Sequence, residues 1–152
     1  HSISMQVLRC LVMVDAVDST AATSRLGEPR VAEFWAAHDR LSRDLLRQWR
    51  GREIDRSDGL LGLFDSVADG AGFAAAYHEA LARLTPALQA RAGLHWCPLA
   101  LREASAEDRD LGARPLEAAG LGRALVARLC ALARPGQTLA SAEAAAVQAD
   151  AG

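Results

Sequence analysis

Two aspartates occupy positions from which a folded chain could present a carboxylate to a cation. Asp15 follows the apolar run 11–14, and Asp58 lies in the stretch 56–59, just before the apolar run 60–64. A continuous apolar run that stops at a charge is typical of a buried strand, and Asp-Gly beside such runs is typical of a β-hairpin turn. The sequence therefore predicts two carboxylates at neighbouring strand ends, although Asp-Gly is also common in hairpins that carry no function.

The residues after Asp15 add a second chemical feature, because they could open a helix. Ser19 and Thr20 are candidate helix caps, and the free backbone N–H groups of a helix start can bind phosphate. Mg²⁺ favours one or two carboxylates, with phosphate and water completing its octahedron. Asp15, Asp58 and this turn therefore suit Mg²⁺ and phosphate groups. Asp18 has two interpretations, either a charge that binds metal or repels phosphate, or an Asx-type turn and helix cap.

The elements that must position these residues are predicted from hydrophobic periodicity. Strands are expected at residues 6–14, 53–55, 60–64, 90–101 and 138–141, and helices at residues 30–50, 67–84 and 121–133. The first strand is apolar on both faces and should therefore lie centrally in the sheet. The last helix has an apolar edge of leucines, at Leu121, Leu125, Leu129 and Leu132. The polar stretch 102–115 is expected to be a loop or flap.

His38 lies on the apolar stripe of the helix expected at residues 30–50. No second His or Cys follows it at the spacing of helical metal ligands. We therefore expect His38 to be a packed or hydrogen-bonded histidine and not a metal ligand.

The composition is that of one globular domain. The chain has 152 residues, of which 51% are hydrophobic, and this is enough for one core. We expect residues 1–4 to be a tag remnant, residues 5–141 to form the domain, and residues 142–152 to be a disordered or truncated alanine-rich tail. A net charge of −2 gives no general drive towards nucleic acid or an anionic membrane.

The cysteines give no sign of a metal or disulfide framework. Cys10, Cys97 and Cys130 show no CxxC spacing, which predicts neither a zinc site nor a set of disulfides. No apolar run approaches the roughly 20 residues that span a bilayer, and no signal peptide opens the chain. A reduced, cytoplasmic location is therefore expected.

Four stretches, taken together, resemble the catalytic domains of class III nucleotidyl (adenylate/guanylate) cyclases, in a divergent, bacterial-type form. They are DAVDST at 15–20, GREIDRSDGLLGLFD at 51–65, RAGLHW at 91–96 and ARLCALARPGQTLAS at 127–141. Their order and spacing match the family over residues 7–141. The resemblance implies an α/β (α+β) fold, a ferredoxin-like βαββαβ sandwich whose antiparallel sheet has helices packed on one face. It also implies a homodimer in which each active site lies between two chains.

The resemblance also assigns roles to individual residues. Asp15 and Asp58 take the places of the two aspartates that bind two Mg²⁺ or Mn²⁺ ions. The backbone of five consecutive residues takes the place of the triphosphate-binding turn, namely Ala16, Val17, Asp18, Ser19 and Thr20. Arg128 stands where the family keeps an arginine that stabilises the transition state from the partner chain. Glu117 stands where the family often keeps a residue that recognises the base.

The reaction that this resemblance implies is an intramolecular phosphoryl transfer. The ribose 3′-hydroxyl of a nucleoside triphosphate attacks the α-phosphorus, a 3′,5′-cyclic nucleotide forms, and pyrophosphate leaves. Such domains serve intracellular signalling and can be attached to a regulatory domain.

The chain departs from the family in two residue types. All 17 basic residues are arginine, and the chain contains neither lysine nor asparagine. Ile54 or Asp55 stands where active adenylyl cyclases usually keep a lysine that recognises adenine, and Ala124 stands where they keep a helix asparagine. The nucleotide base therefore stays open. Two alternatives also stay open: a degenerate cyclase-homology module that dimerises or senses a nucleotide, and a fold used for an unrelated purpose.

Overall fold

The computed structural model describes residues 3–57 and 59–151. Its strands are β1 (Ile3–Val17), β2 (Arg52–Asp55), β3 (Leu60–Phe64), β4 (Gln89–Glu103), β5 (Leu116–Ala119) and β6 (Thr138–Ala140). Its helices are α1 (Ser19–Thr23), α2 (Glu28–Gln48), α3 (Val67–Ala82), α4 (Ala106–Asp110), α5 (Leu121–Leu132) and α6 (Ala142–Ala151). All the predicted strands and helices are therefore present, within a few residues of their expected bounds.

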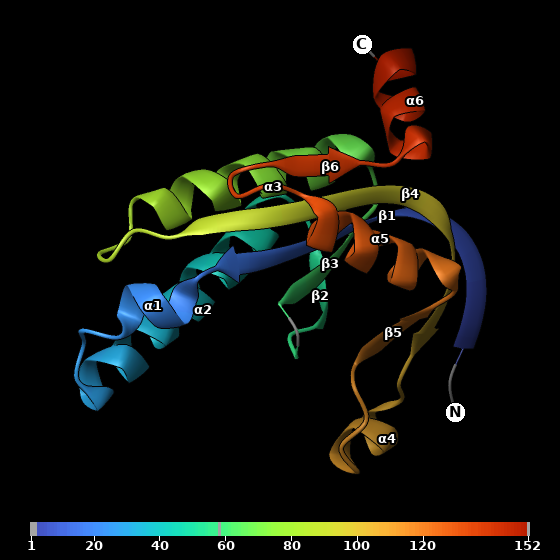
Figure 1. Ribbon diagram of the computed structural model, residues 1–152. Helices are drawn as coiled ribbons and strands as arrows, with labels where there is room; N and C mark the ends of the chain where they lie inside the picture. The colour runs from blue at the N-terminus through green and yellow to red at the C-terminus, as the bar shows by residue number, and fades with distance from the viewer. Residues whose placement is uncertain (1–2, 58, 152) are drawn as a thin grey trace.

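The strands form one sheet in the order β2-β3-β1-β4-β5, and β6 pairs with β4. All strand pairs are antiparallel except that of β4 with β6. β1 lies between β3 and β4, which confirms the central place predicted from its apolar pattern. The succession β1-α2-β2-β3-α3-β4 is the βαββαβ unit of a ferredoxin-like fold (Figure 1), as predicted.

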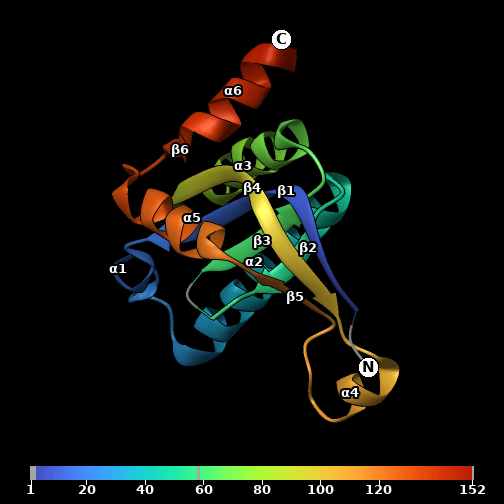
Figure 2. The same cartoon turned by 90° about the vertical axis from the view of Figure 1, so that its right-hand side faces the viewer.

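Side chains of β1 alternate between two cores, because successive residues of a strand point to opposite faces. Cys10, Val12 and Val14 pack with residues of α2 and α3 on one face. Leu11 packs with Val126 of α5 on the other face. The two helices of the βαββαβ unit thus cover one face, as predicted, and α5 covers part of the opposite face (Figure 2).

One predicted boundary is wrong. β1 does not stop before Asp15 but continues to Val17. The reason is the long partner strand β4, which pairs Asp15 with Arg91 and Val17 with Gln89. Asp15 therefore lies inside a strand, next to its end.

Two segments contain more secondary structure than predicted. In the polar stretch 102–115, β4 continues to Glu103 and the short helix α4 follows, before β5. The alanine-rich tail, for which disorder was expected, forms α6. This helix begins after Ser141, whose Oγ accepts a hydrogen bond from the backbone N–H of Ala144 at 3.2 Å. Alanine is the strongest helix former, so the composition and this cap together account for α6.

Neither a disulfide nor a membrane-spanning helix is found in the part of the chain that the structure describes. Cys10, Cys97 and Cys130 are buried and free, in agreement with their spacing in the sequence. Over residues 3–57 and 59–151, no helix combines the length and the apolar character needed to cross a membrane.

Candidate active site

The turn of the β2–β3 hairpin lies beside Asp15. The two strands pair antiparallel, with an irregularity between Glu53 and Asp55. Gly59 has a φ of +93°, a conformation that favours glycine. A Cβ atom at this position would lie 2.5 Å from the Val14 carbonyl oxygen and 3.5 Å from Asp15 Oδ1. Glycine therefore allows the turn to approach Asp15 this closely.

Asp58 lies outside the described residues, so its role as a metal ligand stays a prediction. Asp15, the other predicted ligand, lies beside Gly59, the residue that follows Asp58 in the chain. Within residues 3–57 and 59–151, no three His, Cys, Asp or Glu side chains converge as a metal site. Mg²⁺ needs only one or two protein carboxylates when phosphate and water supply its other ligands. Asp15 fits a site of that kind.

Asp55, at the end of β2, organises the turn. Its carboxylate accepts hydrogen bonds from the backbone N–H groups of Arg56 at 2.8 Å and Ser57 at 3.2 Å, and from the Ser57 hydroxyl at 3.0 Å. Burial alone would raise the pKa of Asp55, but these hydrogen bonds and the charge of Arg114 outweigh burial, so the pKa lies below its ordinary value. Asp55 is therefore held in its charged form.

Two arginines reach Asp55 from distant parts of the chain. Arg114, which precedes β5, lies 3.1 Å from Asp55 Oδ1, and Arg123, on α5, lies 3.4 Å from Oδ2. Ile54 is buried in the core on the α5 face. Neither candidate position for the family's lysine therefore presents a cation, and the positive charges at this point come from other elements.

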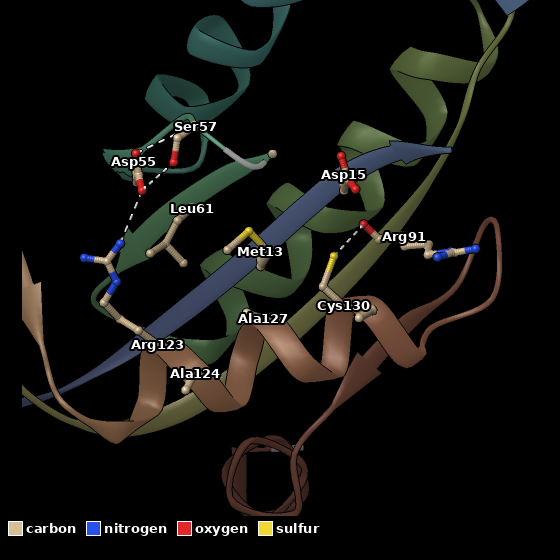
Figure 3. Close-up of a pocket in the computed structure, with 12 residues that line it drawn as sticks. Met13, Asp15, Asp55, Ser57, Leu61, Arg91, Arg123, Ala124, Ala127 and Cys130 are labelled. Carbon is tan, nitrogen blue, oxygen red and sulfur yellow. Dashed lines mark hydrogen bonds and ion pairs between the residues drawn. The ribbon is translucent and has the colours of Figure 1, made fainter. Parts of the chain in front are cut away.

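A cavity of about 480 Å³ opens between the sheet and α5. Its wall consists of Met13, Asp15, Asp55, Ser57, Gly59, Leu61, Arg91, Arg123, Ala124, Ala127, Cys130 and Ala131. Figure 3 shows Asp15 at one end and Asp55 with Arg123 at the other, with Met13 and Leu61 between them. On α5 the wall is mostly made of small side chains, so space remains for a ligand.

The charged residues that line this cavity are Asp15, Asp55, Arg91 and Arg123. The Nε atom of Arg91 is buried without a hydrogen-bond partner among the described residues, whereas buried polar atoms normally have one. Burial raises the pKa of the Cys130 thiol to about 11, with a smaller contribution from Asp15, so this thiol is not an anion near neutral pH. The cavity therefore suits a ligand that carries phosphate charge together with a divalent cation.

The predicted phosphate-binding turn is only partly as expected. Val17 ends β1, and α1 contains Ser19 and Thr20 from its first turn. Asp18 occupies the N-cap position in a left-handed conformation, with a φ of 51°, but its side chain makes no capping hydrogen bond. The Asx-type cap that was one interpretation of Asp18 is therefore not formed.

Part of this turn borders a second cavity, on the α2 side of the sheet. Asp15, Ala16 and Ser19 contribute to its wall, and its volume is about 190 Å³. Asp15 therefore lies between two cavities, one under α5 and one under α2.

Glu117 and Arg128 do not border the cavity under α5. Glu117, on β5, forms an ion pair with Arg102 and lines a separate cavity with Arg114. Arg128 is exposed on α5. The resemblance places Arg128 in the active site of a partner chain, so its role stays a prediction.

Sequence reasoning missed Arg91, Arg123 and the organising role of Asp55. A signal for Arg91 was present, because this residue opens the stretch RAGLHW, one of the four that carry the resemblance. Arg123 gave no such signal, because its contact with Asp55 joins positions 68 residues apart.

Known structures share this fold, although sequence comparison finds no relative. No protein-family model matches the chain, and no curated protein does. The dimeric guanylyl cyclase domain of the RhoGC fusion protein from the aquatic fungus Blastocladiella emersonii superposes with a TM-score of 0.83 and 13% identity, over 99% of this chain and 88% of that chain. The adenylyl cyclase CyaB from P. aeruginosa gives 0.82 and 13%, over 97% and 83%. An adenylate/guanylate cyclase/hydrolase from Silicibacter pomeroyi gives 0.75 and 18%, over 99% and 84%.

At such identities the likeness establishes the fold. The chain has the fold of adenylyl and guanylyl cyclase domains, with an antiparallel sheet and helices packed on it.

Proposed function

We propose that the chain is the catalytic domain of a divergent class III nucleotidyl cyclase, which converts a nucleoside triphosphate to a 3′,5′-cyclic nucleotide and pyrophosphate. The observation that carries the proposal is the approach of the hairpin turn at Gly59 to Asp15, at a cavity that also contains Arg91 and Arg123. The fold shared with adenylyl and guanylyl cyclase domains supports it.

Asp15 and Asp58 would hold two Mg²⁺ or Mn²⁺ ions in this site. Asp15 fits this role because its carboxylate borders the cavity beside the turn, and because one or two carboxylates suffice for Mg²⁺. When bound, such ions activate the 3′-hydroxyl and neutralise the leaving pyrophosphate.

The arginines of the cavity would bind and orient the substrate. Arg91 has a buried Nε–H that no described residue accepts from, and hydrogen bonds between guanidinium and phosphate are among the strongest in proteins. At the opposite end of the cavity, the ion pair with Asp55 orients the guanidinium group of Arg123. The two groups can therefore hold a polyphosphate by two separated positive charges.

The exposed face of α5 supports a homodimer. Leu121, Leu125 and Leu132 are 92%, 42% and 66% exposed, and Arg128 lies at the intervening helical spacing on the same exposed side. Apolar side chains gathered on a surface mark an interaction site. A second copy that covers this face would receive Arg128 in its own active site, as the resemblance implies.

The second candidate is a cyclase-homology module without strong catalysis. Ala124 lines the cavity at the place of the family's asparagine and offers no hydrogen-bond donor from its side chain. Loss of one donor to a transition state costs about a hundredfold or more in rate. A module of this kind would dimerise, bind a nucleotide and regulate an attached domain.

The decisive test is pyrophosphate release from each of the four nucleoside triphosphates, with Mg²⁺ and with Mn²⁺. The variants Asp15→Asn and Asp58→Ala should each lower turnover by about a thousandfold, because metal charge stabilisation contributes several kcal/mol. Asp44→Asn is the matched control, since Asp44 is exposed on α2 and pairs with the exposed Arg47 at 2.9 Å.

Turnover that disappears in both variants and persists in the control would establish the cyclase site and its base preference. If the dimeric protein turns over none of the four nucleotides but binds one of them, the regulatory module is the better interpretation.

A further inference from the structure

A polar network outside the α5 cavity ends at the hairpin turn. Arg56, the residue after Asp55, points towards α2, and its side chain is only 19% exposed. Its guanidinium nitrogens lie 2.6 Å from Glu53 Oε1, 2.9 Å from Ser42 Oγ and 3.3 Å from Asp39 Oδ1. Glu53 belongs to the hairpin and the other two residues belong to α2. Arg56 therefore ties the turn to α2.

The α2 end of this tether is itself fixed. Ser42 is fully buried, and its hydroxyl donates to the Asp39 carbonyl oxygen at 2.8 Å, so its oxygen can accept from Arg56. Asp39 Oδ1 also lies 3.0 Å from His38 Nδ1. Both acceptors of the guanidinium on α2 are thus held by a second hydrogen bond.

His38 extends the network to α3. A carboxylate only accepts hydrogen bonds, so Nδ1 of His38 carries the proton that Asp39 accepts. Nε2 then accepts from the Tyr77 hydroxyl at 2.6 Å. Burial raises the pKa of Tyr77 above its ordinary value, so this hydroxyl keeps its proton and remains a donor. His38 is buried and hydrogen-bonded, as its sequence position predicted.

The network also borders the α2 side of Asp15. The cavity of about 190 Å³ on that side is lined by Asp15, Gly59, His38, Asp39, Arg56 and Tyr77, among others. Two consecutive residues of the turn are therefore held from different directions, Arg56 from α2 and Asp55 from the arginines at β5 and α5.

We propose that Arg56, through its contact with Asp39, is a positioning residue that fixes the hairpin turn against Asp15 and thereby sets the metal affinity of the site. The metal part of this inference rests on the proposed function. The placement of the turn does not, so it can be measured separately.

Hydrogen exchange tests the placement of the turn without any ligand. The amide N–H groups of Arg56 and Ser57 both donate to Asp55 and report whether the turn is held. In Asp39→Asn, a change 17 residues away from Arg56, and in Arg56→Gln, the exchange of the amides at positions 56 and 57 should become about tenfold faster, because local opening becomes easier. Asp39→Asn keeps the shape of the side chain, so the test survives if Arg56→Gln does not fold.

An exposed ion pair on the same helix provides the matched controls. Asp44 and Arg47 lie 2.9 Å apart with both side chains mostly exposed. Asp44→Asn and Arg47→Gln remove equivalent charges and should leave the exchange of the turn amides unchanged.

Metal affinity tests the functional part. The Mn²⁺ concentration for half-maximal binding of a non-hydrolysable nucleoside triphosphate analogue should rise about tenfold to hundredfold in Asp39→Asn and Arg56→Gln, as it does when outer-shell partners of a metal site are removed. The double variant should be no worse than Arg56→Gln alone, because both changes break one tether. If the contact were merely structural, its loss would lower the melting temperature and leave the Mn²⁺ concentration for half-maximal binding unchanged.

The outcomes separate the two proposals. Unchanged exchange at positions 56 and 57 in both variants would overturn the positioning role, whatever happens to stability. Faster exchange with an unchanged Mn²⁺ concentration for half-maximal binding would also overturn the positioning role, because the turn would then not set the metal affinity. If the unmodified protein binds no Mn²⁺-nucleotide, the proposed function fails, and the exchange measurement alone decides whether Arg56 holds the turn.

Discussion

Asp15 separates two regions of the molecule that are constructed differently. On the α2 side, the cavity of about 190 Å³ is lined by polar groups that bond to one another, including His38, Tyr77 and Arg56. On the α5 side, the cavity is larger, about 480 Å³, and the Nε atom of Arg91 has no partner in the described part of the chain.

The difference indicates what each region does. Removing one member of a buried, paired network leaves its partner unsatisfied and destabilises the fold. A buried donor without a partner costs the fold its desolvation free energy and remains available to a ligand. In the proposed function, the α2 side would therefore hold the geometry at Asp15, and the α5 side would receive the ligand. Substitutions on the two sides should separate stability from binding.

Arg91→Gln tests the α5 side and should have a larger effect on nucleotide affinity than any substitution on the α2 side that leaves the turn in place. The affinity for a nucleoside triphosphate analogue should fall about tenfold to hundredfold, because a hydrogen bond to a charged group contributes about 1.5–3 kcal/mol. The free energy of unfolding should not fall, because removing a buried donor that has no partner among the described residues relieves a desolvation cost. Equilibrium binding and urea denaturation measure the two quantities.

The control for Arg91→Gln is Arg47→Gln, which removes the same charge from an exposed position on α2. The distinction between the two regions would be lost if Arg91→Gln lowered the stability and left the nucleotide affinity unchanged.

Tyr77→Phe tests the α2 side and should show the opposite pattern. Loss of the hydroxyl leaves Nε2 of His38 buried without its donor, which should lower the free energy of unfolding by about 1–2 kcal/mol. Nucleotide affinity should change less than threefold, or about 0.6 kcal/mol, because the hydroxyl reaches the turn only through three further residues. A large loss of affinity at unchanged stability would show that this side also contacts the ligand.

The sequence predicted local features well, because they depend on short-range periodicity. The strand expected at residues 60–64 is β3, residue for residue, and the central place of β1 followed from its apolar pattern. Features that depend on distant partners were missed. The extension of β1 through Asp15 requires pairing with Arg91, and the contact of Arg123 with Asp55 crosses 68 positions.

The packing of α5 shows the physical reason most clearly. The sequence showed an apolar edge of leucines on this helix, but in the structure the helix buries Gly122, Val126 and Cys130. Its backbone lies directly over Gly93 of β4, where an added Cβ would be 2.5 Å from the Val126 carbonyl oxygen. Such a close approach leaves no room for a large side chain at Gly93, and three of the four leucines, Leu121, Leu125 and Leu132, are exposed. Periodicity cannot distinguish a core-facing stripe from an exposed one.

Asp55 joins the two regions, and its titration should give the smallest effect. Its pKa in the folded state lies below the ordinary value, so its ionised form stabilises the fold at pH values above about 3.9, the pKa of an unfolded aspartate. This contribution is lost as the pH falls through the lower, folded-state pKa. The free energy of unfolding of the unmodified protein should therefore exceed that of Asp55→Asn by less than about 1 kcal/mol at neutral pH, because the pair is partly exposed.

That difference should shrink as the pH falls below about 4, since protonated Asp55 accepts weaker hydrogen bonds from Ser57 and from the backbone N–H groups of the turn, and no longer attracts Arg114. Urea denaturation of both proteins between pH 7 and about pH 3 measures it, with Asp44→Asn as the exposed control. A difference that stays constant over this range would mean that neither the hydrogen bonds of the turn nor the arginines favour the ionised form of Asp55 in the folded state. The positive charge of Arg123 would then be available to the ligand without any cost to the turn.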